Sequence, residues 1–155
     1  MHPNVERFRT AAREALDRDL DVRELPEGTH SAADAAEAIG CPQSAIVKSI
    51  LFVCDGEPIL IYTAGVHEVD EDALAAHLGC DSVELADPET VTQETGWAIG
   101  GVPPVGHEVN RCLLDPALQN FEQIWGGAGT PEAVAAVEPS ELIEVVGAEP
   151  VEVFD

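Results

Sequence analysis

The strongest constraint on the fold is a pair of apolar runs separated by two turn residues. The runs are residues 46–54 (IVKSILFVC) and 57–65 (EPILIYTAG), both rich in β-branched side chains, and Asp55 and Gly56 stand between them. An Asp-Gly pair readily adopts the positive φ angles of a tight hairpin turn. The sequence therefore predicts two antiparallel strands at the centre of a sheet.

Helix signals lie on both sides of this hairpin. Residues 4–20 carry apolar side chains at helical spacing, which predicts an amphipathic helix. Ser31, with Asp34 three residues later, starts a second helix that Gly40 should end. Further helices are predicted over 69–79, over 87–96 with Asp87 as its cap, and over 139–146. Short strands are predicted at 83–85, 111–114, 123–125 and 133–137, with a closing strand VEVF at 151–154.

The order of these elements predicts the fold class. No repeat, low-complexity tract or linker interrupts the sequence, and 155 residues suffice for one compact domain. We expect a single α+β domain with a mixed, mostly antiparallel sheet that curls toward a barrel and is surrounded by helices. Residues 1–27 should form an N-terminal amphipathic helix and lead-in, and residues 28–155 the functional domain.

The charge balance limits the classes of partner. The sequence has 30 acidic residues against 7 basic ones, a formal net charge of −23. DNA-binding proteins normally have the opposite sign, because Lys and Arg make their phosphate contacts. The 45% hydrophobic content is too high for a disordered acidic tail. We therefore expect a folded domain with an acidic surface and no DNA partner.

Lysine is almost absent, because six of the seven basic residues are Arg and the remaining one is Lys48. Strong screening at high salt would mute the repulsion within such an acidic surface, which favours a halophilic source over a merely acidic mesophilic one. The N-terminus has no apolar leader, and no run approaches ~18 apolar residues. These features predict a cytoplasmic protein without a membrane partner.

The four cysteines give no sign of a metal or redox site. Cys41, Cys54, Cys80 and Cys112 are 13, 26 and 32 positions apart, with no CxxC pair and no histidine at zinc-ligand spacing. Cys54 lies in an apolar run and is predicted to be a buried free thiol.

Lys48 is the first candidate functional residue. Strand alternation places it on one face with Ile46, Ile50 and Phe52. An ammonium among such neighbours costs free energy unless it faces a cleft or has a partner. The alternative is an exposed lysine at a strand end, which the scarcity of lysine elsewhere makes less favoured.

Two glycine-rich segments are further candidates. Residues 96–107 (GWAIGGVPPVGH) contain four glycines and two prolines, which excludes a regular element and predicts a shaped loop. Glycine lets backbone N–H groups approach a ligand closely, so this loop could bind an oxyanion or phosphate, or it could be purely structural. Residues 126–131 (GGAGTP) add close-approach backbone and the Thr130 hydroxyl, although such runs are often plain turns.

Other constellations lack diagnostic spacing. A metal site could be considered at His67, Glu68, Asp70 and Asp72. The pattern is more typical of a solvent-exposed segment that leads into a helix, where acidic residues interact favourably with the N-terminal dipole. Ser49, Cys54 and Thr130 could be weighed as nucleophiles beside a histidine. His107 ends the glycine loop, where a hydrogen-bonded structural role is favoured.

Four segments of the sequence, taken in their order, resemble the YbaK/aminoacyl-tRNA editing domain family. They are AADAAEAIGCPQSAIVKSILFVCDGEPILIYTAG, VDEDALAAHLG, ADPETVTQETGWAIGGVPPVG and GGAGTPEAVAAVEPSELIEVVGA. The resemblance covers roughly residues 28–150. It implies hydrolysis of the ester that links a wrong amino acid to the 3′ end of a tRNA, typically the tRNA for proline, without a metal or another cofactor. The implied partners are that 3′ end and prolyl-tRNA synthetase.

The resemblance also implies the site. Lys48 matches the family lysine and, with Gly101, is assigned to catalysis. The residues assigned to substrate binding are Ser49, Gly100, Pro103, His107, Gly129 and Thr130. Lys48 should act as a protonated donor that holds the terminal phosphate or polarises the ester, and N–H groups of Gly100 and Gly101 should steady the ribose and the developing oxyanion. With no side-chain base in evidence, the substrate's own hydroxyl or amine should orient the attacking water.

One departure leaves the substrate open. Family members often have Ser-Pro-Phe where this sequence has Pro103-Pro104-Val105. A pocket separates side chains that differ by one methylene by only ~1–3 kcal/mol, so alanine, cysteine and serine all remain candidates. Two other functions stay open: a non-catalytic binder of aminoacyl or nucleotide ligands, and a module that works only in complex with a synthetase.

Overall fold

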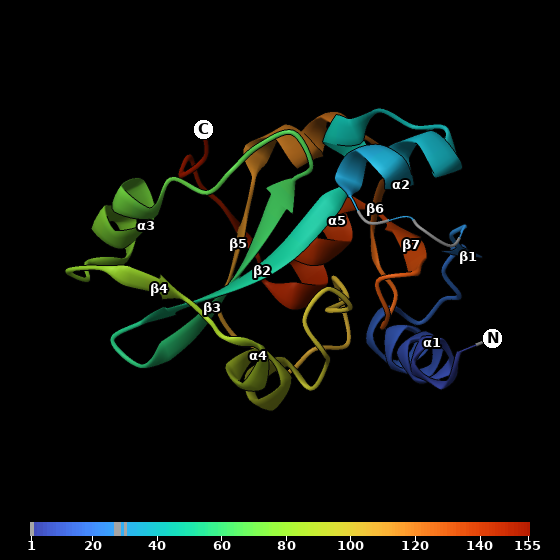
Figure 1. Cartoon of the computed structure of the whole chain (residues 1–155), viewed down its shortest axis with the longest axis horizontal. Coiled ribbons are helices and arrows are strands. Elements are labelled where there is room, and N and C mark those ends of the chain that lie inside the picture. The colour runs from blue at the N-terminus through green and yellow to red at the C-terminus, as the bar shows by residue number, and fades with distance from the viewer. Residues whose placement is uncertain (1, 27–28, 30) are drawn as a thin grey trace.

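The computed structural model describes residues 2–26, 29 and 31–155, and its strands form two sheets (Figure 1). The larger sheet has the order β4-β2-β3-β5-β8 and the smaller one β1-β7-β6. The strands are β1 (Val22–Glu24), β2 (Val47–Cys54), β3 (Glu57–Ala64), β4 (Val83–Leu85), β5 (Cys112–Leu114), β6 (Ile124–Gly127), β7 (Ala133–Val137) and β8 (Glu149–Pro150). The predicted boundary between residues 27 and 28 lies outside the described residues.

Helices cover the two sheets and fill the connections between strands. The α-helices are α1 (Pro3–Leu16), α2 (Ala32–Ile39), α3 (Glu71–Leu78), α4 (Pro88–Thr95) and the single turn α5 (Pro139–Glu141). Shorter pieces are the 3-10 turns η1 (Gln43–Ala45) and η2 (Pro116–Asn120) and the π-helical turn η3 (Leu142–Val146), which continues α5. No helix within the described part of the chain is long and apolar enough to cross a membrane.

The predicted hairpin is confirmed. β2 and β3 pair antiparallel from Val47↔Ala64 to Cys54↔Glu57. The turn between them uses Asp55 at φ 50° and Gly56 at φ 82°, the positive angles that suit the right-handed twist of a two-residue hairpin. β3 also pairs in parallel with β5, and β5 with β8, so the larger sheet is mixed as predicted.

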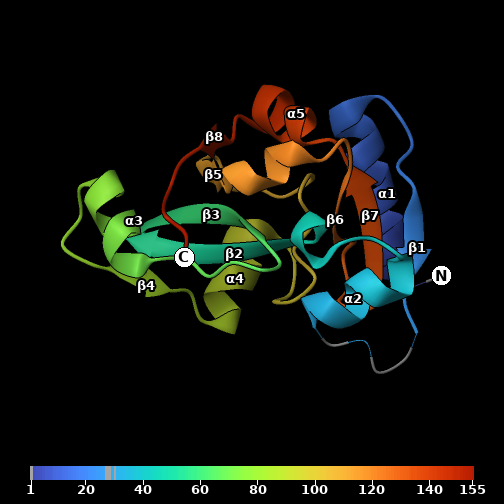
Figure 2. The same cartoon turned by 90° about the horizontal axis from the view of Figure 1, so that it is seen from above.

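The expected single α+β domain with a mixed sheet is confirmed, but in the described part of the chain the sheets are not closed into a barrel. Over residues 2–26, 29 and 31–155, neither sheet closes, and the two sheets lie beside each other with β6 next to the start of β2 (Figure 2). Among the described residues, one isolated parallel bridge, between Ile46 and Trp125, links them. On the other side, β4 pairs only with Phe52–Cys54. The first half of β2 therefore remains an open edge instead of completing a barrel.

The helix ends follow the capping signals in the sequence. The Ser31 hydroxyl accepts a hydrogen bond from Asp34 N at 3.0 Å, and Gly40 ends α2 at φ 85°. Asp87 caps α4 in the same way. The closing strand is a correction, because β8 forms at Glu149–Pro150 and only Phe154 of the predicted segment forms a bridge, with Val69.

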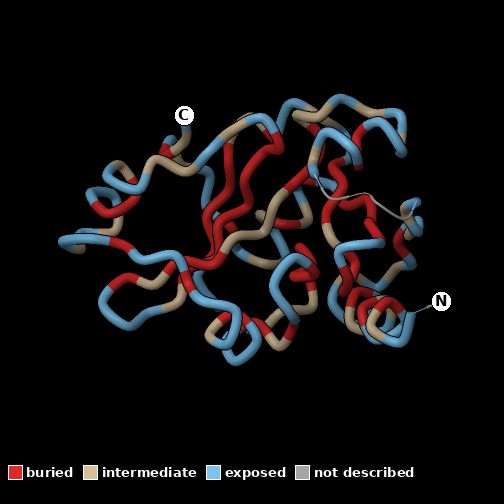
Figure 3. Tube along the Cα trace, viewed as in Figure 1, coloured by how far each residue is buried: buried red, intermediate tan, exposed pale blue. Residues whose placement is uncertain are grey.

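The largest core cluster of the described residues joins side chains of α1 with side chains of both sheets. Figure 3 shows the buried stretches of the chain in red. Val5, Phe8 and Ala12 of α1 are almost fully buried in it. Burying side chains of this size contributes about 1.5–3 kcal/mol for each large one. The N-terminal helix is therefore part of the main core. A second cluster fills the opposite face of the larger sheet under α3.

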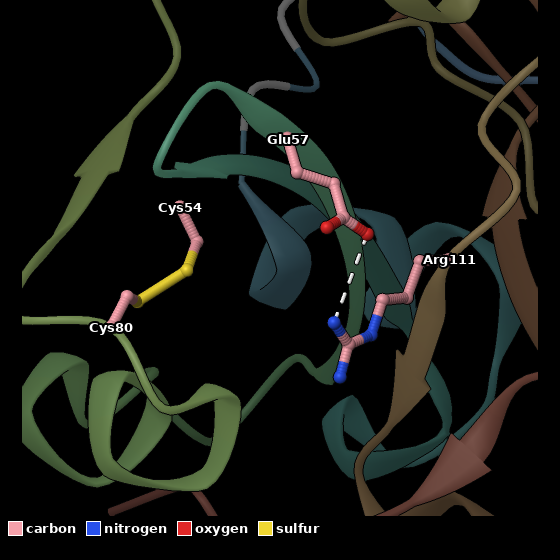
Figure 4. Close-up of a disulfide and its surroundings, with 4 residues drawn as sticks. All are labelled: Cys54, Glu57, Cys80 and Arg111. Atoms are coloured by element: carbon pink, nitrogen blue, oxygen red, sulfur yellow. Dashed lines mark ion pairs between the residues drawn. A yellow bond between two sulfur atoms is a disulfide. The ribbon is translucent and has the colours of Figure 1, made fainter.

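The expectation of a free thiol at Cys54 is wrong, because Cys54 forms a disulfide with Cys80 (Figure 4). The register of β2 with β4 explains the encounter. Cys54 pairs with Val83, which brings Cys80, only three residues earlier, to a Cα–Cα distance of 6.2 Å. Nearby, the exposed side chains of Arg111 and Glu57 form an ion pair at 3.7 Å, a type of contact that stabilises little. Cys41 and Cys112 are free.

Candidate functional site

A cavity of about 440 Å³ lies along the open edge of β2. Its walls come from β2, α2, the β4–α4 junction, the glycine loop and the β6–β7 segment, and the volume suits a small ligand. The lining is mainly aliphatic, and its polar members among the described residues are Thr29, Ser31, Lys48 and Ser49. Lys48 is the charged group among them.

Strand register explains why backbone groups face this cavity. Ile46 O accepts from Gly65 N at 2.8 Å, so Ile46 directs its carbonyl toward the β3 side. Because these directions alternate along a strand, Val47 and Ser49 direct their backbone N–H and C=O groups away from β3. Leu51, two residues further, does the same, since its carbonyl accepts from Ala86 N at 3.0 Å.

Lys48 lies on β2 opposite Thr63 of β3, and its side chain is 31% exposed. Its Nζ donates to His67 O at 3.0 Å and lies 3.7 Å from Glu68 Oε1. An ammonium has three N–H donors, so this carbonyl occupies one and leaves others for a ligand. The lysine is therefore held in place without being neutralised by a buried acid.

Ser49 lines the cavity from the other face of β2. Its hydroxyl oxygen is shielded from solvent and has no hydrogen-bond partner within the described part of the chain. A buried hydroxyl without a partner costs free energy, which a ligand that supplies a donor or acceptor would recover.

The glycine loop reaches the cavity through Gly100, which adopts φ +83°. Gly101 lies behind it: its N–H donates to Ala98 O at 3.0 Å, and its carbonyl accepts from Gly129 N at 3.1 Å. A Cβ on Gly101 would stand 2.8 Å from Gly129 O. The loop thus packs directly on the backbone of the 126–131 turn.

The structure brings Lys48, Ser49 and Gly100 together at the cavity. Among the described residues, the lining does not include Gly101, Pro103, His107, Gly129 or Thr130. Gly129 packs instead against α1, where a Cβ would stand 2.6 Å from Asn4 O. The Thr130 hydroxyl accepts from Glu132 N at 3.1 Å, while its neighbour Pro131 does line the cavity.

His107 belongs to a buried hydrogen-bonded group. Its Nδ1 accepts from Val109 N at 3.2 Å, and its Nε2 lies 2.7 Å from the Tyr62 hydroxyl, which donates to Pro104 O at 2.6 Å. Burial lowers the pKa of His107 to about 4 and raises the pKa of the nearby Cys112 thiol to about 11. Both groups are therefore neutral at pH 7, and the histidine holds the proline segment of the loop.

Helix α1 supports the glycine loop, a role that the sequence analysis did not assign. Arg7 donates to Gly96 O at 3.0 Å, and its guanidinium lies 3.6 Å from the centre of the Trp97 ring. Phe8 meets the same ring edge to face, with centres 6.4 Å apart, and Trp97 Nε1 donates to Gly106 O at 3.0 Å. A tryptophan inside the glycine run was the sequence signal that something packs against this loop.

The acidic group weighed as a metal site is dispersed in the structure. Asp70 caps α3 by accepting from Ala73 N at 3.1 Å, and the His67 ring contacts Asp115 instead. Within residues 2–26, 29 and 31–155, no group of three His, Cys, Asp or Glu side chains could hold a metal ion. No local sequence pattern marks Asp115 as a functional residue.

Comparison with known proteins places the chain in a family. One family, described as "Aminoacyl-tRNA editing domain", matches residues 26–145. A proline–tRNA ligase of Nitratidesulfovibrio vulgaris is 41% identical over 100 residues, which cover 63% of this chain and 17% of the ligase. A proline–tRNA ligase of Geobacter sulfurreducens is 35% identical over 117 residues, covering 76% and 20%. The chain thus spans about a fifth or less of the length of these ligases.

A solved structure extends the similarity to the whole chain. It is described as "Crystal structure of a putative trans-editing enzyme for prolyl tRNA synthetase". It is 34% identical, has a TM-score of 0.93, and the match covers 100% of this chain and 99% of that one. The similarity therefore includes α1, which lies ahead of the residues that match the family.

Proposed function

The chain belongs to the aminoacyl-tRNA editing domain family, and from this we propose that it hydrolyses the ester between a small, wrong amino acid and the 3′ end of a tRNA, with the tRNA for proline as its substrate. The observation that carries the proposal is Lys48, placed in a largely aliphatic cavity that Gly100 also lines. The region similar to this chain in two proline–tRNA ligases supports the choice of tRNA.

The cavity and the surface charge restrict how such a substrate would bind. A volume of about 440 Å³ suits one small aminoacyl group with part of the terminal nucleotide. The net charge of −23 opposes broad contact with phosphates. Recognition would therefore concentrate on the acceptor end, and a synthetase bound to the rest of the tRNA is the partner that we propose.

The proposed reaction is an ester hydrolysis. Water attacks the carbonyl carbon, the bond from that carbon to the ribose oxygen breaks, and the ribose oxygen takes up a proton. The products are the free amino acid and the tRNA with its hydroxyl restored. Lys48 would donate to the carbonyl oxygen as negative charge develops there, with the Gly100 backbone close by.

The proton on the attacking water needs an acceptor. None of the described residues that line the cavity is a carboxylate or an imidazole. We propose that the neighbouring ribose hydroxyl or the α-amine of the substrate orients this water. Ser49, whose hydroxyl has no hydrogen-bond partner among the described residues, would then contact the aminoacyl group.

A panel of charged tRNAs tests the proposal. The tRNA for proline is charged in turn with alanine, cysteine, serine and proline, and release of each amino acid is followed in molar KCl with and without the protein. We expect accelerated release of at least one wrong amino acid, little release of proline, and loss of the acceleration in Lys48→Ala. Slower release than in buffer would instead indicate a binder that protects the ester, and no change with any substrate would refute the proposal.

A further inference from the structure

The carbonyl that holds Lys48 belongs to a turn that follows β3. Gly65 starts this turn, and its N–H donates to Ile46 O at 2.8 Å while its carbonyl accepts from Gln43 Nε2 at 2.8 Å. His67 N then donates to Ala64 O at 2.9 Å. His67 O, at the far end of the turn, accepts from Lys48 Nζ at 3.0 Å.

Asp115 holds this turn through hydrogen bonds that its buried carboxylate accepts. It follows β5 directly, and the parallel register, which pairs Leu114 with Tyr62, brings Asp115 level with the last residues of β3; its side chain is 2% exposed. One carboxylate oxygen, Oδ2, accepts from Ala64 N at 3.1 Å and lies 2.7 Å from His67 Nδ1. The other, Oδ1, accepts from Ala117 N at 3.0 Å.

The contacts form one continuous path from a buried carboxylate to the cavity. Asp115 binds the ring of His67, the backbone of His67 binds the ammonium of Lys48, and Lys48 lines the cavity. A hydrogen bond that involves a carboxylate is stronger and shorter than a neutral one, so the His67 ring has little freedom. Since ring and carbonyl belong to the same residue, fixing the ring limits where the carbonyl can lie.

We propose that Asp115 and His67 are positioning residues for Lys48: the ring contact with Asp115 orients the His67 carbonyl, which in turn aims the ammonium at the substrate. This inference rests on the proposed function, because it assigns a role within the same site. It predicts that weakening the ring contact loosens Lys48 although neither partner touches the cavity.

The lysine content provides a direct readout. Lys48 is the only lysine in the sequence, so an acylating reagent such as acetic anhydride has one side-chain amine to modify besides the N-terminal amine. The rate of Lys48 acetylation, divided by that of the N-terminal amine, reports how tightly the ammonium is held. This measurement needs no tRNA.

The variants are His67→Ala, which removes the ring, His67→Asn, which keeps a side-chain N–H near the position of Nδ1, and Asp115→Asn. His77→Ala is the matched control, because His77 is 34% exposed against 32% for His67 and pairs with an acid, Glu149, on the surface. Thermal unfolding of each variant shows whether it is folded. If Asp115→Asn does not fold, the two His67 variants decide the question.

We expect His67→Ala to acetylate several-fold faster at Lys48 and to lower kcat for deacylation about 10-fold with KM nearly unchanged, because a displaced donor is missed mainly in the transition state. His67→Asn should return both the acetylation rate and kcat most of the way to the wild-type values, and His77→Ala should match the wild type. The inference is overturned if His67→Ala leaves the acetylation rate or kcat unchanged, or if His77→Ala changes them equally. An inactive wild-type protein would refute the proposed function instead, and the catalytic role of this path with it.

Discussion

Lys48 and the glycine loop line the same cavity, but they are supported in opposite ways. Lys48 is held by a short path of hydrogen bonds through His67 to Asp115. The loop has hydrogen bonds of its own but is held mainly by packing, because Trp97 is 3% exposed and lies between the loop and α1, where Phe8 and Arg7 contact its ring. Hydrogen bonds of this kind can be removed at a modest cost in the free energy of unfolding. Removing an aromatic side chain from a packed core costs much more, because it leaves a cavity.

The largest effect is expected where the packing support is removed. Trp97→Ala should lower the free energy of unfolding by about 3–5 kcal/mol, because it leaves a cavity under the loop and deletes the bond to Gly106 O. Urea unfolding measures the loss. Trp97→Phe serves as the control, since it keeps a ring against Phe8 and should lose less. A loss of less than about 1 kcal/mol in the free energy of unfolding for Trp97→Ala would contradict the support of the glycine loop by α1.

The next effect separates chemistry from stability. Lys48→Ala should lower kcat/KM for deacylation about 100-fold, equivalent to about 2.7 kcal/mol, while the melting temperature stays close to that of the wild type. Steady-state kinetics on the substrate found in the tRNA panel measure this. Lys48→Arg keeps the charge and tests whether a compact ammonium is required. Full activity in Lys48→Ala would remove the lysine from the mechanism.

The loop support should also depend on pH. The pKa of His107 is lowered to about 4 by burial, whereas an unfolded histidine titrates near 6.5. Between these values the unfolded chain binds more protons, so stability is full above about pH 6.5 and falls by roughly 3 kcal/mol as the pH drops to 4.

Urea midpoints at several pH values between 7 and 4 test the role of His107. The matched variant is His107→Gln, which cannot titrate in this range and retains an amide that can bond the Tyr62 hydroxyl. The difference between wild type and variant should shrink or reverse as the pH falls, even though carboxylates such as Glu141 contribute their own acid sensitivity to both. Parallel pH profiles for the two proteins would show that His107 does not supply the effect.

The smallest effect on stability is expected at Arg7, the solvent-exposed contact between α1 and the glycine loop. Arg7→Ala should cost about 0.5–1 kcal/mol, because the cation–π contact with Trp97 and the bond to Gly96 O lie near solvent. Arg7→Lys should retain part of the ring contact and lose the bond geometry of the guanidinium. Measurement by urea unfolding beside Arg13→Ala, whose ion pair with Asp19 is exposed, sets the scale of an ordinary surface pair.

Much of the fold could be predicted because its signals are local. The Asp55-Gly56 turn, the Ser31 cap and the glycine at position 40 each act within a few residues, and all three appear as expected. How far the sheet curls toward a barrel could not be predicted, because closure depends on whether β6 pairs along the whole of β2, which no local pattern decides. The disulfide was missed for the same reason, since strand register brings Cys54 to Cys80.

The site shows the same division. Lys48 could be singled out because a lysine in an apolar strand conflicts with its surroundings, and that conflict is visible in the sequence. His67 and Asp115 could not be paired, because 48 residues separate them and only the parallel contact of β3 with β5 brings them together. Gly129 lies against α1, where a Cβ would stand 2.6 Å from Asn4 O, a close approach that no local sequence pattern reveals.

The position of α1 bears on how the domain can be moved between proteins. The residues that match the family begin at 26, yet Val5, Phe8 and Ala12 are buried in the main core and Arg7 contacts the loop. A fragment that starts at residue 26 would expose the part of the main core that α1 covers, and the glycine loop would lose its contacts with α1. For grafting or fusion, the portable unit therefore starts at the first turn of α1, and a design that follows only the sequence match would lose part of the support of the cavity.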